Sequence, residues 1–221
     1  MSLASGVTRF CLIRHGETPW NTQQRIQGHT DIGLDEEGVH QADLAARWLA
    51  SATGQRPTVL YSSDLLRARM TAEKLAERLA LPIGFLPEMR ERRYGIFEGL
   101  TYADARQRYP DDYAAFEQRQ PGYAFPAGGE SLIDFSSRVG ACLQRLAELH
   151  AGETVALVTH GGVLDVINRF IRGLPLEVPR DFTIPNTGLN WVVLSAGCWN
   201  IESWADIRHL DHGALDELGI V

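Results

Sequence analysis

The sequence is nearly without lysine and contains no long apolar run. Lys74 is the single lysine among 21 basic residues, and 28 acidic residues bring the formal net charge to −7. Nucleic acids and anionic membrane surfaces are bound by basic faces, so this balance argues against both as partners. No stretch approaches the roughly 20 apolar residues of a membrane span, and we expect no transmembrane helix.

Cysteine is also scarce. Cys11, Cys142 and Cys198 form no Cys-x-x-Cys pair and show no spacing typical of a metal site. An odd number without such pairs does not indicate a disulfide framework. Free thiols suit a reducing compartment, and residues 1–7 are too short and too polar for a signal peptide. We therefore expect a cytoplasmic protein.

Arginine supplies the other 20 basic residues. Its planar guanidinium makes two-pronged contacts with carboxylate and phosphate groups. A genome-wide codon bias would give the same excess, and that explanation suffices for most of these residues. The arginines that matter must be identified by their position in the fold.

Apolar runs and amphipathic segments alternate along the chain. The pattern predicts strands at 8–13, 58–61, 82–86 and 154–159, helices at 36–50, 65–80, 131–150 and 162–172, and a hairpin at 189–194 and 200–204. Residues 62–64 offer good N-cap chemistry for the second helix. This alternation predicts an α/β fold, a three-layer sandwich with a mostly parallel, doubly wound sheet and helices on both faces.

A length of 221 residues suits one domain, 1–221. The segment 88–130 contains no convincing strand but holds eight of the nineteen aromatic residues. We expect it to form a small helical cap inserted over one edge of the sheet. Its aromatic residues suit either ordinary packing, which we favour, or contact with a ligand.

Polar residues follow the predicted strands. Ligands of open α/β sheets bind beyond the carboxyl ends of the strands, so these residues are expected to meet in one crevice. They are Arg14, His15, Ser62, Ser63, Arg67, Glu88, Glu91, His160, Gly161 and Gly162. The set contains two histidines, two arginines and a carboxylate.

Such a set can bind and transfer a phosphoryl group. The arginines and two helix starts, at Thr18-Pro19 and Gly161-Gly162, favour a tetrahedral anion. A neutral imidazole can attack phosphorus, while the arginines and a protonated second histidine neutralise the developing charge without magnesium. A carboxyl group with a raised pKa would protonate the leaving alkoxide.

Two questions stay open at this level. Spacing does not choose among Glu88, Glu91 and Glu98 as the acid/base. A metal site at the two histidines lacks a third ligand in a recognisable pattern, although His29 or His209 could approach. We expect no metal and no cofactor.

The run Leu-Ile-Arg-His-Gly-Glu-Thr-Pro-Trp-Asn at 12–21 resembles the signature of the histidine phosphatase superfamily, in the branch that contains cofactor-dependent phosphoglycerate mutase. The similarity continues at 27–31, 62–68, 91–99 and 158–162. It implies that His15 is the phosphorylated nucleophile and Glu91 the acid/base. It also implies phosphate or substrate contacts by Arg14, Asn21, Gln27, Gly28, Arg67, Arg92, Tyr94, His160 and Gly161.

The resemblance implies a metal-independent phosphomonoester phosphatase acting through a covalent phosphohistidine. The cap has no lysine, and the stretches 126–131 and 160–162 resemble phosphatase members of the family rather than mutases. A phosphoglycerate mutase is the alternative, and a non-catalytic phospholigand-binding protein is the alternative of another class.

The substrate, a small phosphate ester, is not identified by the sequence. The aromatic cap suits a ring-containing leaving group, whereas Arg92, Arg93, Arg106 and Arg108 suit an acidic one. The edge of the C-terminal hairpin could pair in a homodimer.

Overall fold

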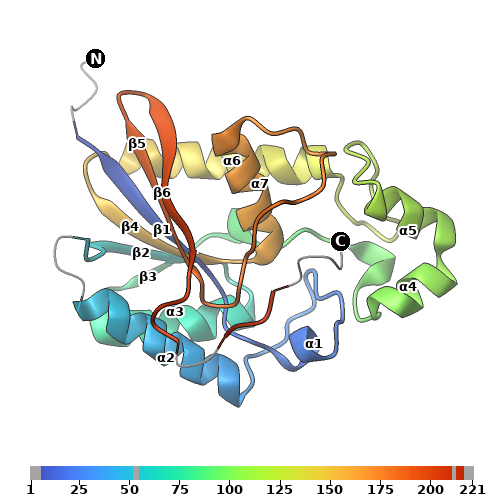
Figure 1. Ribbon diagram of the computed structural model, residues 1–221, viewed down its shortest axis with the longest axis horizontal. Helices are drawn as coiled ribbons and strands as arrows, with labels where there is room; N and C mark the ends of the chain where they lie inside the picture. Colours follow the sequence, from blue (N-terminus) through green and yellow to red (C-terminus); the bar gives the residue numbers. More distant parts are fainter. Residues whose placement is uncertain (1–5, 52–54, 211–212, 217–221) are drawn as a thin grey trace.

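A six-stranded sheet forms the centre of the molecule (Figure 1). The computed structural model describes residues 6–51, 55–210 and 213–216. The strand order is β3-β2-β4-β1-β5-β6. Their bounds are Thr8–Arg14 (β1), Val59–Ser62 (β2), Ile83–Phe85 (β3), Thr154–Thr159 (β4), Leu189–Ser195 (β5) and Cys198–Asp206 (β6). Strands β1 to β4 pair in parallel, and β5 and β6 add an antiparallel edge, which confirms the mostly parallel sheet.

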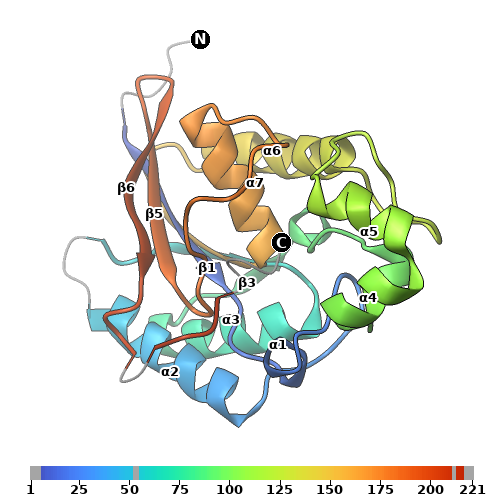
Figure 2. The ribbon, with the colours of Figure 1, turned by 45° about the vertical axis from the view of Figure 1, so that its right-hand side comes forward.

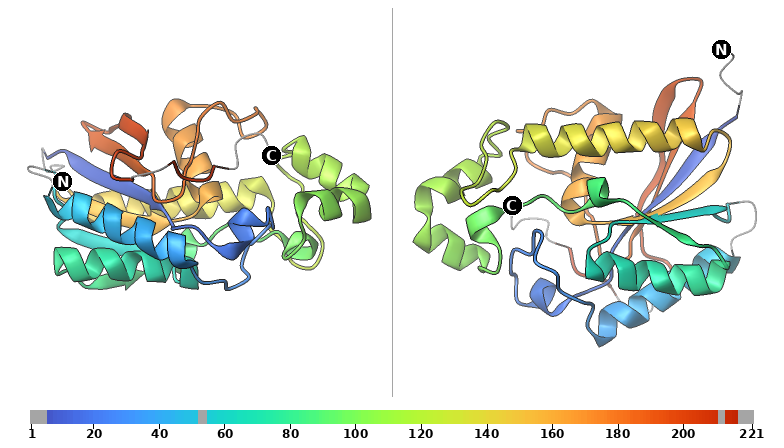
Figure 3. Two further views of the ribbon diagram at one scale, coloured as in Figure 1. Left: turned by 60° about the horizontal axis from the view of Figure 1, so that its bottom comes forward. Right: turned by 180° about the vertical axis from the view of Figure 1, so that it is seen from behind.

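Helices cover both faces of this sheet (Figure 3). Helices α2 (Glu36–Ser51) and α3 (Leu66–Leu79) lie on one face, and α6 (Leu132–Leu149) and α7 (Gly161–Arg172) on the other. Alternate residues of β1 point to opposite faces: Phe10 and Leu12 pack in the core under α6 and α7, whereas Cys11 and Ile13 pack in the core under α2 and α3. The predicted three-layer α/β sandwich is confirmed.

The start of α3 differs from the prediction. Its N-cap is Leu65, which makes no side-chain cap. The Leu66 amide instead donates to Asp31 Oδ1 at 2.6 Å, from a loop far away in the sequence. The Ser63 hydroxyl also contacts a distant residue, because its Oγ lies 2.7 Å from His160 Nε2. The Ser63 hydroxyl accepts from the amide of the N-cap residue Leu65 at 3.4 Å, but not from an amide within the helix. The predicted N-cap is therefore wrong for the helix itself, because a tertiary contact from Asp31 takes its first amide.

Between β3 and α6 the chain forms two 3₁₀ turns, Pro87–Met89 (η1) and Gly95–Phe97 (η2), and the helices α4 (Tyr102–Arg108) and α5 (Pro110–Glu117). Helices α4 and α5 stand to one side of the sheet (Figure 2). Phe97, Tyr113, Phe116 and Phe125 form a separate small core with Ile26. Most of the aromatic residues in this segment therefore serve packing, and Tyr94, Tyr102 and Phe116 also line a pocket.

The loop after β1 lies directly against the start of α2. A Cβ added at Gly16 or Gly38 would overlap backbone atoms of the other segment. This close crossing fixes the chain just beyond His15 against the body of the fold. Within the described ranges, no helix has the length and apolarity needed to cross a bilayer.

Candidate active site

A pocket opens where β1 and β4 end, next to α4 and α5. It holds about 930 Å³ of space, including its open mouth, and six arginines and two carboxylates line it. The sequence-predicted residues among its lining are Arg14, His15, Gln27, Gly28, Arg67, Glu91, Arg92, Tyr94, Gly161 and Gly162. The His160 ring lies beside that of His15, with a centroid distance of 5.3 Å. Most of the strand-end residues thus meet at one place, whereas Ser62, Ser63 and Glu88 are not among the lining residues.

His15 is buried and held in one orientation. Its Nδ1 lies 2.7 Å from the Gly16 carbonyl oxygen, which can only accept, so Nδ1 carries the proton and Nε2 keeps its lone pair. Burial, followed by the charges of Arg67 and Arg14, lowers the pKa of His15 well below 6.5. The ring is therefore a neutral imidazole with an available nitrogen, which is the form that a nucleophile requires.

His160 is also neutral in the free pocket. Burial lowers its pKa well below 6.5, and Arg67 and His15 lower it further. This differs from the protonated ring expected from the sequence, because the expectation took no account of burial beside a guanidinium. Its Nε2 is 2.7 Å from Ser63 Oγ, and its buried Nδ1 has no hydrogen-bond partner among the described residues. A bound dianion would favour proton uptake by this ring.

Backbone carbonyls fix Arg14 and Arg67, the two arginines that the sequence predicts to bind phosphate. Arg67, 1% exposed, donates from Nη2 to Gly28 O at 2.8 Å and from Nη1 to Thr30 O at 3.1 Å. Arg14 donates from Nη1 to Ile184 O at 2.8 Å. Each contact leaves the guanidinium charged and holds it at the pocket. Two fixed guanidiniums beside His15 form a site for a tetrahedral anion.

Glu91 reaches the pocket from the loop after η1. Its Oε1 accepts from the Arg92 amide at 2.7 Å and its Oε2 from the Gly162 amide at 2.9 Å. Glu88 instead pairs with Arg145. Glu98, the third carboxylate left open by the sequence, accepts from the Tyr94 amide. Among these three carboxylates, Glu91 is the one that lines the pocket.

The two predicted helix starts differ in their position. The start of α7, with His160 as N-cap and Gly161 at the pocket, lies where the prediction placed it. Helix α1 (Pro19–Thr22) is a single turn closed by a capping box between Thr18 and Asn21. Its start does not line the pocket, so the prediction of a second anion-binding helix start is wrong. The Asn21 side chain is buried and hydrogen-bonded to Thr18.

Four further charged residues, which the sequence did not predict, also line the pocket. They are Arg25, Arg119, Asp165 and Arg180. Arg119 follows α5 in a left-handed conformation, with φ 51°. It donates to Asp165 Oδ2 at 2.5 Å and to Leu176 O at 2.8 Å. No local pattern marks these residues, because three segments outside helices and helix α7, far apart in the sequence, bring them together.

Arg92 also faces this part of the pocket, and its guanidinium donates to the carbonyls of Tyr123 and Glu130. Arg93, Arg106 and Arg108, by contrast, are not among the lining residues. The expectation of an acidic leaving group therefore rests on Arg92 and on arginines that the sequence did not suggest. It does not rest on Arg93, Arg106 or Arg108.

No group of three or more His, Cys, Asp or Glu side chains suited to a metal ion occurs within residues 6–51, 55–210 and 213–216. His29 Nε2 lies 2.8 Å from the Glu91 carbonyl oxygen, and His209 Nε2 lies 3.3 Å from Thr187 Oγ1. Each of these two histidines thus contacts a protein group.

The family model of the histidine phosphatase superfamily (branch 1) matches residues 10–207. A metal-independent phosphoserine phosphatase of Arabidopsis thaliana is 37% identical over 211 residues, which cover 95% of this chain and 86% of the relative. A probable phosphoglycerate mutase of Photorhabdus laumondii is 35% identical over 220 residues, covering 94% and 97%.

Among solved structures, a phosphoserine phosphatase of Entamoeba histolytica superposes with a TM-score of 0.81 at 28% identity in its complex with phosphoserine, covering 92% of this chain and 99% of that one. Its complex with 3-phosphoglyceric acid gives the same TM-score at 29% identity and the same coverage. The pocket and these similarities together identify a hydrolase of small phosphoric monoesters, and the chain belongs to the histidine phosphatase superfamily (branch 1).

Proposed function

We propose that the protein hydrolyses a carboxylate-bearing phosphomonoester, without a metal, through a phosphohistidine on His15. The observation that carries this proposal is the state of the His15 ring. It is buried and neutral, its Nδ1–H is used by Gly16 O, and its other nitrogen is available beside two fixed arginines.

In the first step, His15 Nε2 attacks phosphorus and the P–O ester bond breaks. Arg14 and Arg67 neutralise the charge on the non-bridging oxygens, which is the function that a metal ion has in other phosphoryl transfer enzymes. The Glu91 carboxyl group gives its proton to the leaving alkoxide. His160 contributes a further hydrogen bond from Nδ1, the buried atom that has no partner among the described residues.

In the second step, the Glu91 carboxylate takes a proton from water. The resulting hydroxide attacks phosphorus, the P–N bond breaks, and inorganic phosphate leaves a neutral His15. Glu91 thus returns to its protonated form, and one proton donor serves both steps. The start of α7 at Gly161 supports the phosphoryl oxygens in both steps.

The leaving group would carry a carboxylate. Beyond the phosphate-binding residues, the pocket wall contains Arg25, Arg92, Arg119 and Arg180 but a single further carboxylate, Asp165. Asp165 pairs with Arg119 and Asp216 pairs with Arg180, so the surplus consists of Arg25 and Arg92, whose guanidiniums donate to backbone carbonyls. This surplus of guanidinium groups favours an anionic group on the substrate. Phosphoserine and phosphoglycerate, the ligands named for the Entamoeba structures, have this chemistry.

The direct test is covalent labelling. Brief mixing with ³²P-phosphoserine in excess EDTA should label the wild-type protein, and the label should be acid-labile and base-stable. His15→Ala should take up no label and release no phosphate. Turnover by His15→Ala, or its complete loss in EDTA, would contradict the proposal.

Mutase activity is the second candidate, because relatives of similar identity are named as probable phosphoglycerate mutases. Hydrolysis is favoured here because the segment 88–130 has no lysine. With 3-phosphoglycerate as substrate, phosphate release should exceed interconversion of the two monophosphoglycerates. The reverse ratio would establish a mutase. A non-catalytic binding protein would show neither reaction and no label.

Two further expectations concern the compartment and the oligomeric state. Cys11, Cys142 and Cys198 are free thiols, and free thiols suit the reducing cytoplasm. For a homodimer, β6 is the terminal strand of the sheet order and offers one edge. Sedimentation velocity would test the dimer.

A further inference from the structure

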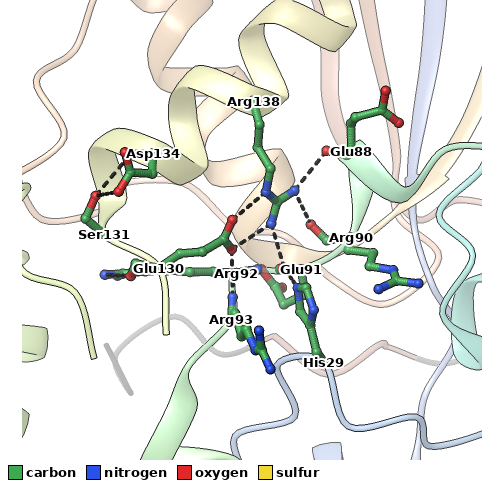
Figure 4. Close-up of polar contacts among 10 residues, drawn as sticks. All are labelled: His29, Glu88, Arg90, Glu91, Arg92, Arg93, Glu130, Ser131, Asp134 and Arg138. Atoms are coloured by element: carbon green, nitrogen blue, oxygen red, sulfur yellow. Dashed lines mark hydrogen bonds and ion pairs between the residues drawn. The ribbon is translucent and has the colours of Figure 1, made fainter. Parts of the chain in front are cut away.

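One guanidinium holds the backbone that carries Glu91. Arg138, on α6, donates from Nη1 to the carbonyls of Glu88 at 2.8 Å and Arg90 at 2.9 Å, and from Nη2 to that of Glu91 at 2.8 Å. Its Nε and Nη2 donate to the two carboxylate oxygens of Glu130, at 2.6 and 2.8 Å. A guanidinium has five N–H donors, and all five are used (Figure 4).

Glu130 connects this guanidinium to the next residues of the same loop. Its Oε2 accepts from the Arg93 amide at 2.9 Å, and its own amide donates to Arg93 O at 2.8 Å. Burial alone would raise the pKa of Glu130, but hydrogen bonds from Arg138 and the Arg93 amide hold that pKa below its usual value. Glu130 is therefore ionised, and the pair forms a charged clamp on the 88–93 loop.

The Glu91 backbone has a second fixed contact. His29 Nε2, 2.8 Å away, donates to the same carbonyl oxygen that accepts from Arg138. The Glu91 side chain then reaches forward to the amides of Arg92 and Gly162. The carboxyl group is thus held at its backbone by α6 and at its tip by α7.

We propose that Arg138, clamped by Glu130, is a positioning residue that aligns Glu91 for proton transfer to the leaving group. It is not a catalytic residue, since the pocket lining does not include it. This inference rests on the proposed function of Glu91. Lysine cannot replace arginine here, because three donors on one nitrogen cannot reach acceptors spread across three residues and a carboxylate.

The test exploits the leaving group. A proton donor matters for an alkyl ester such as phosphoserine, whereas 2,4-dinitrophenolate is stable enough to depart unprotonated. The measure is kcat/KM, because it reports the steps up to departure of the leaving group and excludes the later attack of water. General acid catalysis contributes about 10²–10⁴-fold, and a misaligned acid should lose part of that factor.

We expect Arg138→Gln to lower kcat/KM for phosphoserine about 10- to 100-fold and for 2,4-dinitrophenyl phosphate less than about 3-fold. Glu130→Gln should show the same selectivity with a smaller loss, and Arg138→Lys should not restore activity. In a Glu91→Gln background, Arg138→Gln should add less than about 3-fold, since the two residues act through one group.

Arg145→Gln is the matched control. Arg145 lies on the same helix and pairs with the exposed side chain of Glu88 at 3.0 Å. It should leave both substrates at wild-type rates. Equal losses for the two substrates, or a full additional loss in the Glu91→Gln background, would show a merely structural role for Arg138 and overturn the inference.

Glu130→Gln retains the shape of the clamp, so it keeps the test decisive if Arg138→Gln does not fold. Its selective loss on phosphoserine would support the inference, and wild-type rates on both substrates would overturn it. Failure of the proposed function itself is separate, because wild-type protein would then form no phosphohistidine and hydrolyse neither ester.

Discussion

At the scale of single residues, the pocket keeps its histidines neutral by burying them beside guanidinium groups. Burial is the larger cause of the lowered pKa of both His15 and His160, and the charge of Arg67 acts in the same direction. In the proposed mechanism the same arginine thus binds the phosphoryl group and helps to keep the nucleophile unprotonated. Because protonation of these buried rings is unfavourable, the stability of the folded protein should decrease when the pH falls.

The free energy of unfolding should therefore fall in mild acid. Unfolded histidines protonate near pH 6.5, whereas His15 and His160 resist protonation in the folded state. Below that pH the unfolded chain therefore binds more protons than the folded chain. The stability present at neutral pH declines as a result. His160→Gln should reduce the slope by up to about 1.4 kcal/mol per pH unit. Urea unfolding between pH 7.5 and 5 measures it. His40→Gln, on an exposed site of α2, is the control, and equal slopes in the two variants would contradict the prediction.

Arg119 should determine selectivity for acidic leaving groups. Its guanidinium is held by Asp165 and Leu176 O at the pocket wall. Arg119→Gln should lower kcat/KM for phosphoserine about 10- to 100-fold, the value of one charge-assisted contact, and leave p-nitrophenyl phosphate within about 3-fold. Arg106→Gln, which breaks a cap ion pair with Glu117 outside the pocket, should change neither. A uniform loss in Arg119→Gln would indicate a packing role.

At the scale of elements, the start of α7 sets the position of Glu91. A Cβ at Gly162 would overlap Glu91 Oε1. That atom is the end of a flexible side chain, so Gly162→Ala should fold but displace the carboxyl group. We expect kcat/KM for phosphoserine to fall at least about 10-fold, with little change in Tm. Gly140→Ala, where a Cβ meets nothing within 4 Å, is the helix control and should keep wild-type activity. Wild-type activity in Gly162→Ala would show that Glu91 tolerates displacement.

The elements could be predicted because each has a local signal. Strand β4 is a compact apolar run, and His160 follows it, so the strand-end rule located His160 without knowledge of the fold. The rule fails where the structure depends on a distant partner. Asp31 contacts the first turn of α3 in place of a local cap, and Arg119 joins the pocket through its hydrogen bond to Asp165 of α7. Sequence periodicity contains no information on such contacts.

At the scale of the whole molecule, a formal charge of −7 surrounds a pocket lined by six arginines. These arginines come from β1, the loop before η2, α3, and the segments that follow α1, α5 and α7. An anion bound among them therefore connects the sheet to the segment 88–130. Phosphate should act on the stability of the entire fold rather than on one loop.

Inorganic phosphate should accordingly raise Tm. A ligand at 100 times its Kd adds about 2.7 kcal/mol, which corresponds to about 5–10 °C for a chain of this size. Arg67 also holds the loop at Gly28 and Thr30, so Arg67→Gln should have a lower Tm before phosphate is added. The quantity to compare is therefore the phosphate-induced shift in Tm. That shift should nearly vanish in Arg67→Gln, while sodium chloride at equal ionic strength should give none in either protein. Equal shifts in the two proteins would place the phosphate elsewhere, because a site built around Arg67 cannot bind the dianion equally well without its guanidinium.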